Sequence, residues 1–74
     1  MKAPKFKTGQ QIVLPDGLYF VNEPEVIDGR LYTIDYHIWK AGVWYVVLQE
    51  FGALKGLIEY HFRAATKKEI NAPF

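Results

Sequence analysis

The chain has 74 residues, no cysteine, a formal net charge of +1, and 16% aromatic residues (five Tyr, five Phe and two Trp). This length fits one domain, and a charge so close to zero is not that of a dedicated nucleic-acid binder. The absence of cysteine excludes disulfides, thiolate metal sites and thiol nucleophiles. So small a domain needs a rich apolar core, and the 50% hydrophobic share can supply one.

The opening residues carry Lys2, Lys5 and Lys7 but no apolar stretch after them, which is not the pattern of a signal peptide. Small secreted domains usually rely on disulfides. No segment approaches the roughly 20 apolar residues of a membrane span. We therefore expect a cytoplasmic protein that does not enter a membrane.

The first third of the chain predicts two short strands and a long irregular segment. Residues 1–8 form a lead-in that Phe6 anchors, and residues 10–14 form the first strand. Pro15-Asp16-Gly17 is a turn, because proline presets the first turn position and glycine accepts a positive φ. Residues 18–21 return as a short strand. Residues 22–29 are then irregular and acidic.

Residues 30–51 predict the central hairpin. Two sets of residues alternate here with the period of two of a strand on a core: Tyr32, Ile34, Tyr36 and Ile38, and Leu31, Thr33, Asp35 and His37. Lys40-Ala41-Gly42 suits the turn. Residues 43–48 are apolar on both faces, which is typical of a central strand covered on each side.

The last third predicts one more strand and a short helix. Gly52 and Gly56 flank a turn and would cost a helix about 1 kcal/mol each, so we expect residues 57–63 to form a strand, with a 3₁₀ turn at 60–62 as the alternative. Thr66 and Glu69 fit a capping box that starts one or two helical turns, ended by Asn71 and Pro73.

Short strands at spacings near ten residues predict a small all-β barrel. The most economical arrangement is a five-stranded SH3-like barrel over residues 9–74, with a short C-terminal helical turn and the lead-in 1–8. An incomplete OB-like barrel is the second choice, because its usual length is greater.

Four short motifs resemble a known group of proteins. Phe6-Lys7-x-Gly9 and Ile12-Val13 are similar to the start of many SH3-like barrels, and residues 29–34 resemble a Tyr-Thr-aliphatic strand of small phage and prophage proteins. The later aliphatic strand and closing Phe-Arg of those proteins are matched by Val46-Val47-Leu48 and Phe62-Arg63. Residues 15–28 and 59–61 depart from the pattern. The resemblance implies a barrel without assigned activity, located in the host cytoplasm if a phage encodes it.

Two similar triplets, Asp35-Tyr36-His37 and Glu59-Tyr60-His61, hold residue types that bind zinc or iron. If the strands form a meander, residues 43–51 separate the triplets by about 9–10 Å, two strand spacings. That distance is too long for one shared metal. We expect no metal and no cofactor, and His–carboxylate neighbours on a polar outer face.

Catalysis is not indicated. The chain has no Ser, and Thr8, Thr33 and Thr66 have no activating pattern beside them. Gly52-x-x-x-Gly56 lacks the following Lys and hydroxyl residue of a phosphate-binding loop. The sequence therefore predicts that the protein is not an enzyme.

Binding is the function class that the composition favours, because so small a domain cannot bury all of its aromatic side chains. We expect a protein partner or self-association, through candidate residues Tyr19, Tyr36, Trp39, Trp44 and Tyr45. The alternative for the two Trp residues is that they plug the ends of the barrel.

The second binding hypothesis is a weak nucleic-acid accessory protein. If the two termini meet, their lysines form one basic pole on which cations contact phosphates while aromatic rings stack on bases. The candidate residues are Lys2, Lys5, Lys7, Arg63, Lys67 and Lys68.

Overall fold

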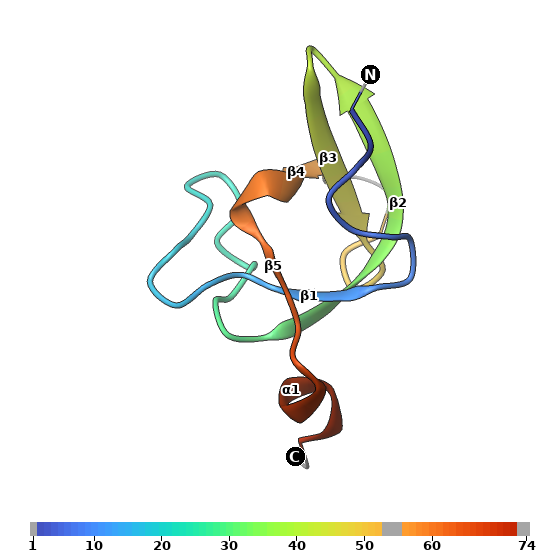
Figure 1. Ribbon diagram of the computed structural model, residues 1–74. Coiled ribbons are helices and arrows are strands. Elements are labelled where there is room, and N and C mark those ends of the chain that lie inside the picture. The colour runs from blue at the N-terminus through green and yellow to red at the C-terminus, as the bar shows by residue number, and fades with distance from the viewer. Residues whose placement is uncertain (1, 53–55, 73–74) are drawn as a thin grey trace.

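The computed structural model describes residues 2–52 and 56–72 (Figure 1). Its elements in chain order are β1 (Gln11–Val13), β2 (Leu31–Lys40), β3 (Val43–Leu48), β4 (Gly56–Ile58), the 3₁₀ turn η1 (Glu59–His61), β5 (Arg63–Ala64) and α1 (Lys67–Asn71). The described residues include no helix long and apolar enough to span a membrane.

The five strands form one antiparallel sheet in the order β4-β3-β2-β1-β5. The long strand β2 belongs to both halves of the sheet, since its first residues pair with β1 and its remainder pairs with β3. The predicted all-β fold with a short helix is therefore confirmed. The pairing runs in one open series that ends at β4 and β5, so closure into the predicted SH3-like barrel is not seen among the described strands.

A β-bulge at Asp35 reverses the two faces of β2. Ile34 pairs with Leu48, but Tyr36 pairs with Val47, so β2 has one residue more than β3 at this point. Because side chains alternate with a period of two, one extra residue turns every later side chain to the other face. The expected single apolar face through Ile38 is therefore wrong. Past the bulge, His37 faces inward and Tyr36 faces outward.

The core lies against the inner face of the sheet. It draws on every strand except β5, and also on the lead-in, on the long loop between β1 and β2, and on Phe62. Two-sided burial of β3, which the sequence predicts for the whole strand, holds only for residues 46–48. The buried cluster comprises Phe6, Ile12, Leu14, Val26, Tyr32, Ile34, Val46, Leu48, Leu57 and Phe62.

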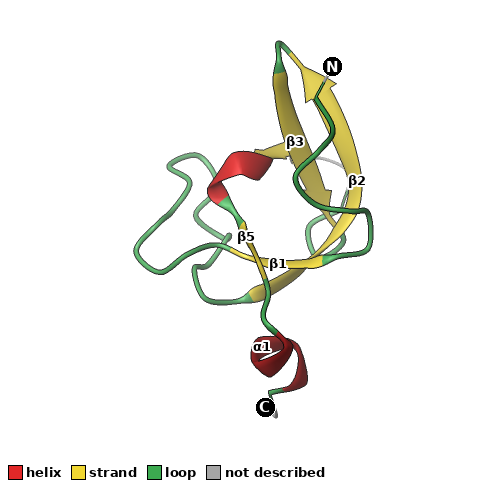
Figure 2. Ribbon diagram, viewed as in Figure 1, coloured by secondary structure: helices red, strands yellow, loops and turns green. Residues whose placement is uncertain are grey.

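Residues 14–30 form a long loop with no strand, so the predicted strand at 18–21 is wrong (Figure 2). Two contacts with the body of the domain order the loop. Val26 is buried, and the Ile27 amide donates to the Tyr32 hydroxyl at 2.9 Å. Its two ends meet where the Gly29 amide donates to the Leu14 carbonyl at 2.9 Å. Burial of Val26 and these hydrogen bonds replace sheet pairing in ordering the segment.

The predicted strand at 57–63 is wrong over its second half. The chain leaves the sheet after β4 and forms η1, the 3₁₀ alternative placed one residue earlier than expected. This turn carries Glu59 inward, where it is buried. The predicted turn between Gly52 and Gly56 falls largely on residues 53–55, outside the described residues.

Helix α1 starts as predicted. The Glu69 amide donates to the Thr66 hydroxyl at 3.1 Å, and the Thr66 amide donates to the Glu69 carboxylate at 2.9 Å. None of the helical residues is buried. The helix projects from the sheet at the opposite end from the opening residues (Figure 1).

The β2–β3 hairpin turns through Ala41 and Gly42, both with positive φ (52° and 76°). Two such residues define the type I′ turn, which matches the twist of the strands. Asparagine or glycine suits the first position, whereas a left-handed alanine costs about 1 kcal/mol. The turn therefore forms with a strained residue, Ala41, at its first position.

We expect Ala41→Asn to raise the free energy of unfolding by about 0.5–1 kcal/mol, because asparagine tolerates a positive φ. Gly42→Ala, in the same turn, should lower it by about 1 kcal/mol through backbone strain alone, since an added Cβ would meet nothing within 4 Å. Urea unfolding of both variants checks this. Equal effects of the two changes would contradict the type I′ assignment.

Candidate functional site

The five aromatic residues proposed from the sequence lie on three different surfaces. Trp39 and Trp44 are cross-strand partners on the inner face of the hairpin, with ring centroids 5.0 Å apart. Tyr36 and Tyr45 lie on the outer face, because the bulge separates their side from that of Trp39. Tyr19 lies on the loop between β1 and β2 and is 75% exposed. The structure therefore brings the two Trp residues together on one face, places Tyr36 and Tyr45 on the other, and leaves Tyr19 apart from both pairs.

An additional aromatic residue joins the Trp pair. Tyr60 on η1 is 78% exposed and lines, with Trp39 and Trp44, a cavity of about 290 Å³. We call this cavity the aromatic groove. A strand over residues 57–63 would not bring Tyr60 to the two Trp residues, so Tyr60 is not among the candidates predicted from the sequence. The signal in the sequence that could have found it was the alternative 3₁₀ turn. The groove is lined by Lys2, Ala3, Lys5, Trp39, Gly42, Val43, Trp44, Glu59 and Tyr60.

A buried carboxylate forms the base of the aromatic groove. Glu59 is only 3% exposed and accepts hydrogen bonds from the amides of Lys5 (2.6 Å) and Phe6 (3.2 Å). His37 Nε2 lies 2.9 Å from the second carboxylate oxygen. A carboxylate only accepts hydrogen bonds, so this contact requires the imidazole proton on Nε2. Three N–H groups thus compensate the burial of one charge.

The contact between His37 and Glu59 overturns the expected separation of the two triplets. The estimate of about 9–10 Å assumed that both triplets lie on strands of a flat meander. Because Glu59 belongs to η1, it folds back over the inner face instead, and the bulge turns His37 toward it. Within residues 2–52 and 56–72, no group of three or more His, Asp or Glu residues is placed to hold a metal ion.

The opening residues Lys2, Ala3 and Lys5 line one wall of the aromatic groove. The Trp44 indole N–H donates to the Lys2 carbonyl at 2.7 Å. Farther along, the Lys5 ammonium donates to the Phe62 carbonyl at 3.0 Å and lies 5.1 and 5.8 Å from the rings of Phe6 and Tyr60. One side of the groove is therefore formed by the opening segment, with the Lys5 ammonium held beside Tyr60.

The basic residues do not form one pole. Lys2 and Lys5 line the aromatic groove, whereas Lys67 and Lys68 lie on α1 at the far end of the molecule (Figure 1). Lys7 is exposed before β1. Arg63 forms a two-point contact with the Glu69 carboxylate, both distances being 2.8 Å. The expectation that the termini meet is thus wrong.

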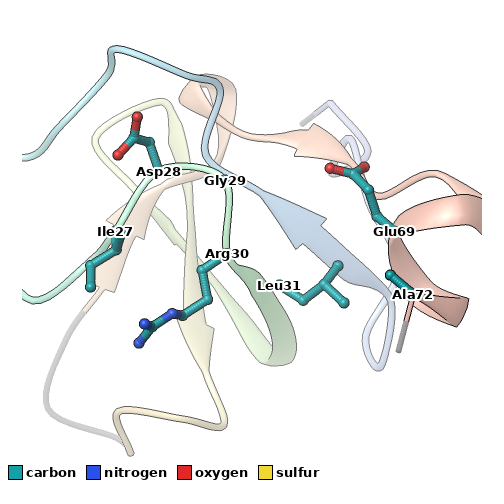
Figure 3. Close-up of a pocket in the computed structure, with 7 residues that line it drawn as sticks. All are labelled: Ile27, Asp28, Gly29, Arg30, Leu31, Glu69 and Ala72. Atoms are coloured by element: carbon teal, nitrogen blue, oxygen red, sulfur yellow. The ribbon is translucent and has the colours of Figure 1, made fainter. Parts of the chain in front are cut away.

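A second hollow of about 740 Å³ lies between α1 and the end of the long loop (Figure 3). Both carboxylates among its described lining residues bind other parts of the chain. Asp28 accepts from the Gly17 amide at 2.9 Å, and Glu69 binds Arg63 and caps α1. None of its described lining residues is aromatic. Its lining is Ile27, Asp28, Gly29, Arg30, Leu31, Glu69 and Ala72.

A third hollow, of about 200 Å³, lies on the other side of η1 from the aromatic groove, beside Tyr19, Phe20 and His61. The rings of Phe20 and His61 meet edge to face with centroids 5.8 Å apart. The turn η1 therefore separates two small hollows with aromatic linings.

Comparison of the chain with protein-family models, curated proteins and solved structures gives no significant match. Function must therefore be inferred from the residues themselves.

Replacing Glu59 tests the buried carboxylate. We expect Glu59→Ala to lower the free energy of unfolding by about 3–5 kcal/mol, because it leaves two amides and an imidazole without an acceptor. Glu50→Ala is the matched control, since the exposed Glu50 carboxylate also accepts from a backbone amide, that of Thr33. The control should cost no more than about 1 kcal/mol. Similar urea midpoints for the two variants would contradict a central role for Glu59.

The cap of α1 should respond to acid. The hydrogen bond from Arg63, together with that from the Thr66 amide, lowers the pKa of Glu69 from 4.5 to about 2. A lowered folded-state pKa means that stabilisation is complete above pH 4.5 and is lost as the pH falls toward 2. An NMR titration of the Glu69 side chain should therefore have its midpoint near 2, with α1 amides exchanging faster below it. Glu69→Gln should remove this dependence, and a midpoint near 4.5 would refute the prediction.

Proposed function

We propose that this chain is a non-catalytic protein-interaction module built as a small SH3-like barrel of phage or prophage type. The strand order, the bulged β2 shared by both halves of the sheet and the short β4 and β5 support the barrel, because bulges bend sheets toward closure. The phage assignment rests on the resemblance of the strand motifs. A cytoplasmic location belongs to the same proposal.

The observation that carries the proposal is the grouping of Trp39, Trp44 and Tyr60 around one cavity. Trp39 keeps 37% of its surface exposed and Tyr60 far more. Aromatic rings at a concave surface are the usual centres of binding energy in protein interfaces. The aromatic groove is accordingly the proposed docking surface.

The absence of catalysis is part of the same proposal. Glu59 and His37, the acid and imidazole nearest the groove, contact each other, and Glu59 also accepts from the backbone amides of Lys5 and Phe6. Their side chains are 4% and 9% exposed. A general acid or base must reach its substrate, whereas these two side chains are buried and bonded within the protein.

Self-association has a surface of its own on the outer face of the hairpin. Tyr36, Ile38 and Val43 are each more than a third exposed. Tyr45 is the cross-strand neighbour of Ile38 on one side and of Ile58 on the other. An apolar sheet face of this kind is a common site of contact between copies. Self-association would therefore use residues distinct from those of the aromatic groove.

Nucleic-acid binding is the second candidate, because Lys2 and Lys5 line the same cavity as the three aromatic rings. Protein sites for single-stranded nucleic acids combine such aromatic rings with cationic side chains. It ranks lower since the other proposed cations, Lys67 and Lys68, lie at the far end of the molecule.

The experiment is comparative capture with matched variants. Immobilised wild-type protein, Trp39→Ala and Tyr36→Ala are exposed to the same host extract, and bound proteins are quantified. We expect a partner that wild type and Tyr36→Ala retain and that Trp39→Ala loses, since removing a central aromatic ring costs about 2 kcal/mol or more, roughly 30-fold in affinity.

Two measurements separate the alternatives. Light scattering at two concentrations should show a monomer if the partner is another protein, and a dimer abolished by Tyr36→Ala if the outer face self-associates. A mass increase with an oligonucleotide that salt reverses, and that Lys2→Met with Lys5→Met abolishes, would instead support the nucleic-acid function. Identical retention by all three immobilised proteins would refute the groove as docking surface.

A further inference from the structure

We infer that the aromatic groove binds an extended acidic peptide segment, with a carboxylate at Lys5 and an adjacent apolar side chain between Trp39 and Tyr60. This inference rests on the proposed function and specifies the chemistry of the partner. It depends on three features of the groove: the donors on its walls, its charge and its size.

The groove already holds backbone of the chain itself. Lys2, Ala3 and Lys5 of the opening segment line it, and the Trp44 indole N–H donates to the Lys2 carbonyl at 2.7 Å. On the facing strand, the indole N–H of Trp39 makes no hydrogen bond within the part of the chain that is described, and its ring is more than a third exposed. Trp39 therefore offers to an incoming peptide carbonyl the kind of bond that Trp44 makes to the opening residues.

The groove also holds a positioned cation. The Lys5 ammonium has three donors, and one of them is bonded to the Phe62 carbonyl. This bond and the rings of Phe6 and Tyr60 fix the ammonium at the rim. A cation held in place before binding loses little conformational entropy when a carboxylate contacts its remaining donors.

The charge balance of the lining favours an anion. Two lysines, Lys2 and Lys5, face the cavity, against one carboxylate, that of Glu59, among the described lining residues. The oxygens of Glu59 are already bonded to two amides and to His37. An acidic residue of a partner thus meets exposed ammonium groups, whereas a basic residue meets only like charge.

The size and the sparse cations favour a peptide over a nucleic acid. A cavity of about 290 Å³ is at the lower limit of small-ligand sites. Single-stranded nucleic acid needs a series of cations that follows its backbone over several nucleotides. The described lining of the groove supplies two. A short peptide with alternating acidic and apolar side chains fits both constraints.

The test uses the full chain and three blocked pentapeptides. The acidic probe is acetyl-Glu-Val-Glu-Val-Glu-amide, and its matched controls replace each Glu by Gln or by Lys. Binding is read from the fluorescence of Trp39 and Trp44, the two tryptophans of the chain. We expect saturable binding of the acidic peptide, at least tenfold tighter than that of the Gln peptide, and no saturable binding of the Lys peptide.

Two variants locate the contact. Lys5→Met keeps the backbone amide that binds Glu59 but removes the ammonium, so it should abolish the preference for Glu over Gln. Lys68→Met, an exposed lysine on α1, should leave the preference unchanged. Circular dichroism and urea unfolding of both variants confirm that they fold.

Each other outcome overturns a distinct statement. Equal affinity for the Glu and Gln peptides would overturn the acidic preference and leave peptide docking intact. No saturation by any of the three peptides would overturn both the inference and the groove as docking surface. Tighter binding of a ten-residue oligothymidylate than of the acidic peptide would replace the peptide by nucleic acid.

Discussion

The buried carboxylate of Glu59 is the interaction on which the rest of this structure depends. A charge removed from water is tolerated only where donors replace its hydration, and here two backbone amides and one imidazole do so. These donors come from the lead-in and from β2, so one side chain ties three distant segments together. Phe6 can enter the core because the amides of Lys5 and Phe6, which lose water there, donate hydrogen bonds to this carboxylate. The position of Lys5 beside Tyr60 follows from the same contact.

The bulge at Asp35 determines which residues can share a surface. Without the extra residue, His37 and Trp39 would face outward and Tyr36 and Ile38 would cover the core. With it, the inner face continues past the core as His37, Trp39 and Trp44 and ends in the aromatic groove. The outer face of the same hairpin retains a separate apolar surface. One added residue in β2 therefore produces two independent candidate interfaces.

Charge is distributed along the long axis of the molecule rather than gathered at one end. The opening lysines lie beside the groove, and the lysines of α1 lie at the opposite end. Arg63 and Glu69 neutralise each other where α1 begins. Among the described residues, the aromatic groove is the place where cations and exposed rings coincide.

Local physical chemistry, readable from the sequence, determined the hairpin of β2 and β3, the first strand, the anchoring of Phe6 and the Thr66 cap. Each depends on alternation, turn chemistry or side-chain bonds between residues a few positions apart. Three features were decided only by the tertiary structure: the packing of Val26 and the partly buried Phe20 on the core, the turn η1, and the grouping of Trp39 with Tyr60. The contact between Lys5 and Glu59 joins residues 54 positions apart, and the bulge becomes visible only when β2 is aligned with β3. A pattern along one strand reports its period but not its register against a partner, so the face of a residue such as Trp39 is set by pairing rather than by its neighbours in sequence.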